Sequence, residues 1–92
     1  MAIKSIESKG VRELYESGCT KRIGSRYQRK LLELLDILAA ATSVIDLQGV
    51  SKFRALQGNR RGVYSMHVNG PKVITFGFEN GEASNIDFGN CP

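Results

Sequence analysis

The side chains best suited to chemistry lie in the second half of this 92-residue chain, around its single histidine, His67. An imidazole can accept or donate a proton near neutral pH. Its possible partners, by charge and position, are Arg54, Arg60, Arg61, Lys72 and Asp87. A proton-transfer group among several cations could act on a substrate that carries or develops negative charge. A lone histidine in a strand is also common as a structural residue, because one ring without an orienting partner makes neither a triad nor a metal site.

A group of basic residues lies earlier in the chain and comprises Lys21, Arg22, Arg26, Arg29 and Lys30. Over the whole chain, thirteen Lys and Arg against nine Asp and Glu give a net charge of +4, which favours an anionic partner. A solvated helix surface explains such a cluster equally well. Contact with phosphate groups and a solvent-facing role therefore both remain open.

Composition and cysteine count narrow the class of protein. A chain of this length with 41% hydrophobic and 24% charged residues is expected to fold as one domain over residues 1–92. Cys19 and Cys91 are too few for a disulfide framework, and neither belongs to a CxxC pair with histidines at zinc spacing. We therefore expect free thiols, no metal and no cofactor. No apolar run is long enough to cross a bilayer and no signal peptide is evident, so we expect a cytoplasmic protein without membrane contact.

Two helices are expected in the first half of the chain, after a short alternating strand at residues 2–6. Apolar residues at helical spacing begin at Val11, and Gly18 is suited to end this first helix in a left-handed conformation. The second helix is longer, and Ser25 could cap its first turn. Its apolar face comprises Tyr27, Leu31, Leu34, Leu35, Leu38 and Ala41.

The rest of the chain is predicted to form strands joined by turns. After a connector over residues 44–58, the segments 63–68 and 72–78 alternate between two faces, with the hairpin signal Asn69-Gly70 between them. Shorter strands are expected at 53–56 and 83–88, the second of them after a turn at 79–81. The sequence therefore predicts an α+β fold, a small twisted antiparallel β-sheet with two N-terminal helices packed on one face.

One stretch of the second half has a more specific pattern. It runs from Leu56-Gln57-Gly58-Asn59-Arg60-Arg61-Gly62-Val63-Tyr64-Ser65 to Val68-Asn69-Gly70, and is followed by Ile74-Thr75-Phe76 and Phe78-Glu79-Asn80-Gly81. This pattern resembles the HigB branch of the RelE/ParE superfamily, the plasmid maintenance system killer family. Members commonly have L-K-G, an acidic residue or Asn, then Arg-x-Gly, and later Val-Asn and an I-T-F-x-F strand. The resemblance covers nearly the whole chain.

The resemblance implies a RelE-like toxin of a type II toxin–antitoxin pair. Members of the family enter the ribosomal A site and cleave mRNA, and a cognate helix-turn-helix antitoxin neutralises them. The implied partners are this antitoxin, the ribosome and mRNA, with operator DNA contacted only through the antitoxin. The resemblance also implies that the basic helix and the sheet share one RNA-facing surface.

Metal-free RNA cleavage assigns roles to the candidate residues. It needs a base for the proton of the 2′-hydroxyl, an acid for the leaving oxygen, and cations for the charge on the phosphoryl group. Arg60 matches the family motif, and we expect Arg60 and Lys72 to be the cationic catalytic residues, with His67 or Asp87 moving a proton. The residues expected to bind RNA are Arg22, Arg26, Arg29, Lys30, Arg54 and Arg61.

Several positions depart from the family pattern. Alternation places Val73, Thr75 and Gly77 on one strand face, and the family usually has arginine or another polar or basic residue at the first and third of these positions. The usual acidic-aromatic-histidine ending is replaced by residues 87–92, which contain no histidine and no tyrosine. Arg54 occupies the place of a family histidine.

Two classes of function therefore follow. In the first, the chain is a ribosome-dependent mRNA endonuclease that uses a reduced set of groups. In the second, it is a catalytically weakened or inactive relative that binds antitoxin or ribosomal RNA without cleaving. A gyrase-directed toxin of the same superfamily is a further alternative, which the HigB-like hairpin motif disfavours.

Overall fold

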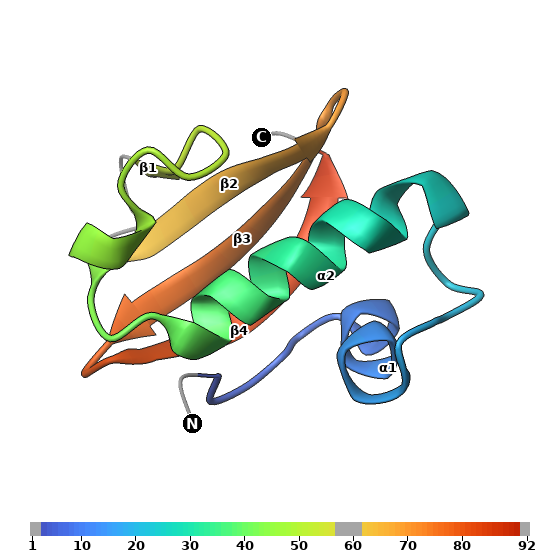
Figure 1. Ribbon diagram of the computed structural model, residues 1–92, viewed down its shortest axis with the longest axis horizontal. Coiled ribbons are helices and arrows are strands. Elements are labelled where there is room, and N and C mark those ends of the chain that lie inside the picture. Colours follow the sequence, from blue (N-terminus) through green and yellow to red (C-terminus); the bar gives the residue numbers. More distant parts are fainter. Residues whose placement is uncertain (1–2, 57–61, 91–92) are drawn as a thin grey trace.

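The computed structural model describes residues 3–56 and 62–90. Two α-helices come first, followed by a short 3-10 helix and four strands (Figure 1). Their bounds are α1 Lys9–Ser17, α2 Ser25–Ala40, η1 Val44–Leu47, β1 Arg54–Ala55, β2 Val63–Asn69, β3 Lys72–Glu79 and β4 Glu82–Asn90. Every helix within these residues is too short or too polar to cross a membrane.

The four strands form one antiparallel sheet in the order β1-β2-β3-β4. In Figure 1, α2 runs across one face of this sheet, and α1 lies next to the N-terminal half of α2. The predicted α+β arrangement, with both helices on one side of an antiparallel sheet, is confirmed. Among the described residues, helices cover one face of the sheet and none covers the opposite face.

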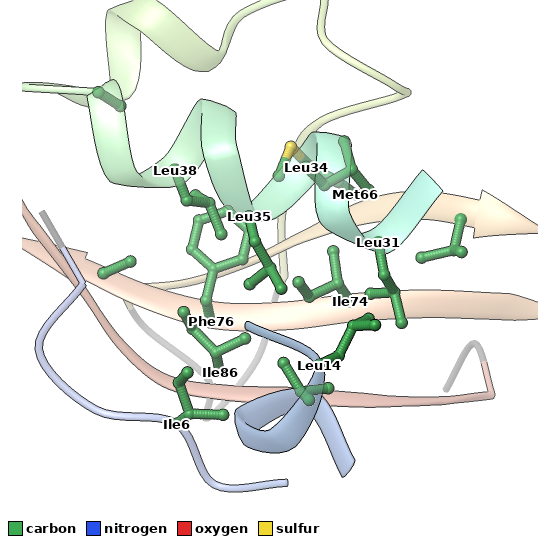
Figure 2. Close-up of a cluster of buried hydrophobic side chains, with 14 of the residues drawn as sticks. Ile6, Leu14, Leu31, Leu34, Leu35, Leu38, Met66, Ile74, Phe76 and Ile86 are labelled. Carbon is green, nitrogen blue, oxygen red and sulfur yellow. The ribbon is translucent and has the colours of Figure 1, made fainter. Parts of the chain in front are cut away.

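The hydrophobic core fills the space between the helices and the covered face of the sheet (Figure 2). The apolar face of α2 supplies four leucines, all at most 1% exposed, and β3 supplies Ile74 and Phe76. Leu14 of α1 and Ile6 of the N-terminal segment close the core from the side, as Figure 2 shows. Burial of each such side chain stabilises the fold by about 1.5 to 3 kcal/mol, so the covered face dominates stability.

The ends of α1 and the start of α2 show how local interactions determine where a helix begins and ends. The Ser8 hydroxyl accepts a hydrogen bond from the Val11 backbone N–H at 3.2 Å and caps α1. Gly18 ends α1 with a φ of 83°, as predicted. The prediction of a Ser25 cap is wrong, because Ser25 is already helical and Gly24 precedes it without any side-chain cap. The helix therefore depends on packing of its apolar face rather than on a capping bond.

The two hairpins differ in how well the sequence predicted them. Asn80 and Gly81 have φ values of 55° and 78°, the two positive values of a type I′ turn, at the predicted place. The first hairpin turns at Gly70 and Pro71, one residue later than the Asn69-Gly70 signal, because Asn69 still pairs with Lys72. A bulge between His67 and Asn69 accounts for the shift.

The N-terminal segment is not the continuous strand that alternation predicted. Ile3 and Ile6 form isolated parallel bridges with Ala83 and Ile86 of β4, and Ala2 lies outside the described residues. These contacts cover the outer edge of β4 up to Ile86. Beyond that point the Asp87 carboxylate accepts a hydrogen bond from the Phe88 N–H at 2.8 Å. Occupied N–H groups of this kind limit pairing of an edge strand with other chains.

Candidate active site on the open face of the sheet

The face of the sheet opposite the helices, which we call the open face, carries a row of polar side chains. Residues directly opposite each other on neighbouring strands project from the same face. Arg54 pairs with Ser65, Ser65 with Thr75, and Thr75 with Asp87. Because Ile74 and Phe76 point into the core, Thr75 between them points to the open face, and the whole row does so with it. The predicted separation of the two faces of β3 is confirmed.

A pocket of about 250 Å³ lies at one end of this open face. It is lined by Lys52, Arg54, Ser65, His67, Gly70 and Val73. Among residues 3–56 and 62–90, Ser65 is the only buried polar residue, with 2% of its surface exposed, and it lies beside the exposed Arg54. The pocket therefore combines two basic side chains, one imidazole and the apolar Val73, a composition suited to an anionic ligand.

The hydrogen bonds of His67 define which ring nitrogen is available. Its Nε2 lies 3.0 Å from the carbonyl oxygen of Gly70. A carbonyl oxygen can only accept, so Nε2 carries a hydrogen in this arrangement. In the neutral ring the unprotonated nitrogen is then Nδ1, which has no hydrogen bond to the described part of the chain. The ring is held by an orienting partner, which the sequence did not reveal.

Lys52 is a pocket residue that the sequence analysis missed. It precedes β1 and has a φ of 56°, in the left-handed region. No pattern in the sequence marks it, because lysine rarely adopts this conformation and the loop has no strand or helix periodicity. Lys52 is two residues before Arg54, and this spacing is the one feature of the sequence that would place both side chains on the same face of a strand.

Asp87 lies on the same face as the pocket but does not line it. It is two strands away from Ser65, about 10 Å at the usual strand spacing. The side chain is exposed, and its Oδ1 already accepts the Phe88 N–H. Direct contact between Asp87 and His67 is therefore absent, and a role in proton transfer would require a substrate that spans this distance.

Lys72 lies on the opposite face from His67 and is separated from the pocket. Its Nζ is 5.7 Å from the centre of the Phe88 ring, on the side of the sheet that the helices cover. Phe88 in turn packs against Tyr27 of α2, with ring centres 5.5 Å apart, and Cζ of Arg26 lies 5.1 Å from the Tyr27 ring. The structure therefore groups Lys72 with Arg26, in an array of two cations and two aromatic rings.

The remaining basic residues of the first half also lie on the helix side. Arg22 forms an ion pair with Glu13, with 3.0 Å between Nε and Oε2. Hydrogen bonds from Thr20 and then Arg22 lower the pKa of the Glu13 carboxyl below its ordinary value. Arg29 is exposed and Lys30 half-buried on α2. The implied single surface for basic helix and sheet is not observed, because α2 covers the face opposite the pocket.

Two of the predicted residues, Arg60 and Arg61, lie outside the described residues. Within the described ranges, no group of three or more His, Cys, Asp or Glu side chains could hold a metal ion.

A second hollow, of about 480 Å³, lies at the other end of the open face over Gly77 and Ser84. Its described lining has the carboxylate of Glu79 and no cation, so it is less suited to an anion.

Two comparisons with known proteins bear on this geometry. The sequence model described as the RelE-like toxin of type II toxin–antitoxin system HigB matches residues 4–89. The chain is also similar to Endoribonuclease HigB of Proteus vulgaris, with 31% identity over 87 residues that cover 94% of this chain and 95% of that protein. These matches, together with the fold, define the class as small RelE-like toxins. Within that class the chain belongs to the HigB-like toxin family, and membership implies an antitoxin as partner.

Proposed function

We propose that this toxin is a ribosome-dependent mRNA endonuclease whose active site is the pocket on the open face of the sheet. The observation that carries the proposal is the convergence of Arg54, Lys52 and His67 on one pocket in a HigB-like fold. The similarity to an endoribonuclease of Proteus vulgaris supports the same activity. The ribosomal A site would present the mRNA, and a helix-turn-helix antitoxin would oppose the activity and make the contact with operator DNA.

The pocket supplies two of the three functions that RNA cleavage needs. In this proposal, Nδ1 of His67 takes the proton of a 2′-hydroxyl, whose oxygen then attacks the adjacent phosphorus, and the contact of Nε2 with Gly70 supports this choice of nitrogen. The positive charge of Arg54 at the pocket favours binding of the phosphate group. The third function, protonation of the leaving 5′-oxygen, falls to Asp87 or to a group of the ribosome, because no acid lines the described pocket.

The cations on the helix side receive a separate role. We assign Arg26, Arg29, Lys30 and Lys72 to contacts with RNA phosphates away from the bond that is cleaved. Arg22 contributes less, because its guanidinium is already paired with Glu13. Arg60 and Arg61 keep their assigned roles in catalysis and RNA binding as proposals from the sequence motif alone.

One observation favours the alternative of a relative that binds without cleaving. The open face of β3 presents Val73, Thr75 and Gly77, none of which can stabilise negative charge as arginine does. Loss of one such preorganised group costs about 100- to 1000-fold in rate. The test must therefore distinguish cleavage from binding.

Inducible expression in a bacterial host, followed by mapping of the 5′ ends of cellular mRNA, makes this distinction. The proposal predicts growth arrest and new 5′ ends inside translated codons, both lost in His67→Gln and in Arg54→Gln. Arrest with intact message would reject cleavage in favour of binding alone. Arrest with gyrase-linked DNA damage would instead indicate the gyrase-directed alternative.

A further inference from the structure

The loop that leads into β1 has an uncommon backbone. Ser51 and Lys52 have φ values of 41° and 56°, and neither is glycine, asparagine or aspartate, the residues that adopt left-handed conformations most readily. Two such residues in succession are unfavourable, because Cβ approaches the following carbonyl oxygen. Strained residues of this kind persist only where neighbouring contacts hold them, and they are concentrated at functional sites.

The contacts that hold this loop come from His67. The backbone N–H of His67 donates to the carbonyl oxygen of Ser51 at 2.7 Å, and the Ser51 hydroxyl donates to the carbonyl oxygen of His67 at 2.5 Å. Both backbone groups of one β2 residue are thus bound by a single residue of the loop. This pair of hydrogen bonds, the Ser51 clamp, fixes the loop against β2 three residues before Arg54, which pairs with Ser65.

The consequence of the clamp is the position of Lys52, which lines the pocket together with Arg54 and His67. Lys52 is exposed, and the one ion pair within residues 3–56 and 62–90 joins Arg22 to Glu13, so no carboxylate there neutralises its ammonium group. An ammonium group with three donors suits a phosphate oxygen. A strained lysine without an acidic partner, at the rim of a cationic pocket, is best explained by a ligand that it binds.

We propose that Lys52 is a phosphate-binding residue of this pocket, and that the Ser51 clamp maintains its left-handed conformation so that it contacts the same RNA phosphate as Arg54. The identification of the anion as RNA rests on the proposed function, whereas the role of Lys52 in anion binding rests on the pocket and the clamp. Strain at Lys52 then exists because binding requires a side chain at this position.

The test measures affinity for a fluorescently labelled RNA of four nucleotides with 2′-O-methyl riboses, which cannot be cleaved. Lys52→Gln is expected to bind about tenfold more weakly. The slope of log affinity against log salt concentration should become shallower by about one, because one phosphate contact is lost. The matched control is Lys9→Gln at the start of α1, which removes the same charge away from the pocket and is expected to bind like the unmodified protein.

Affinity of Lys52→Gln equal to that of the unmodified protein, with weaker binding by Arg54→Gln and His67→Gln, would overturn the role of Lys52 and leave the proposed function standing. Failure of every pocket variant to weaken binding, or absence of binding altogether, would overturn both.

A second measurement separates binding from a structural role. Glycine adopts the left-handed conformation without the steric cost, so Lys52→Gly should unfold at an unchanged temperature or up to about 5 °C higher. Its affinity for RNA should be reduced as in Lys52→Gln. A lower unfolding temperature would show that the lysine side chain supports the fold and would overturn the proposal.

Discussion

The two faces of the sheet use the same strands for different purposes. On β3, the residues that point toward α2 are Ile74, Phe76 and Phe78, all of them large and buried. Their neighbours on the open face include Thr75 and Gly77, which are smaller and only partly buried. The hydrophobic contacts that stabilise the fold are therefore concentrated on the face covered by the helices. The other face of the same strands can carry cations and a pocket.

Arginine introduced at adjacent positions of β3 should give the largest difference between the faces. Ile74→Arg places an unpaired charge in the core and is expected to prevent folding, because a buried charge costs several kcal/mol. Val73 is also buried, with 6% of its surface exposed, but it lines the pocket, so an arginine there can extend through the pocket to solvent. Val73→Arg should therefore fold and bind the methylated RNA about tenfold more tightly. Circular dichroism and the binding assay check both outcomes, and equal folding of the two variants would contradict the assignment of faces.

A truncation of side chains should give a smaller contrast in the same direction. Phe76→Ala is expected to lower the free energy of unfolding by about 3 to 5 kcal/mol, because it leaves a cavity in the core. Thr75→Ala, one residue away on the open face, should lower it by less than about 1 kcal/mol. Urea unfolding of the two variants measures the difference, and similar losses would show that the open face also carries stability.

The smallest effect concerns a region that belongs to neither face. Hydrogen bonds from the Thr42 backbone N–H, then from its hydroxyl and from Ser43, lower the pKa of the Asp46 carboxyl below its ordinary value of 3.8. Because the pKa is lower in the folded state, the stabilisation is fully present above the ordinary pKa. It is lost as the pH falls from the ordinary pKa through the lower pKa of the folded state. Asp46→Asn should therefore unfold at a temperature that depends less on pH below about pH 4, with RNA binding unchanged. A pH dependence identical to that of the unmodified protein would contradict this assignment.

Periodicity predicted most of the covered face, because burial imposes regular spacing on side chains. It predicted the leucines of α2, the two faces of β3 and the turn at Asn80-Gly81. It failed where local geometry interrupts the period, as at the bulge that moves the first turn to Gly70 and Pro71. The helix cap at Ser25 failed because the preceding glycine already begins the helix without a side-chain bond.

The candidate site was less predictable than the fold. In a strand, residues two positions apart point to the same face, so Lys72 lies on the covered face with Ile74. The separation of Lys72 from His67 was therefore predictable from the sequence. The orientation of the His67 ring by Gly70 and the left-handed backbone of Lys52 depend on contacts between distant segments. No spacing rule encodes contacts of this kind, and only the folded chain reveals them.

We propose that the open face of the sheet, and not the helix side, performs cleavage. Purified ribosomes programmed with a defined mRNA, with saturating toxin and a single round of cleavage, allow His67→Gln and Lys72→Gln to be compared at equal folding. We expect the cleavage rate to fall about 100-fold or more in His67→Gln, and by no more than about tenfold in Lys72→Gln. A large loss for Lys72→Gln with near-normal cleavage by His67→Gln would contradict this proposal and move the active site to the other face of the sheet.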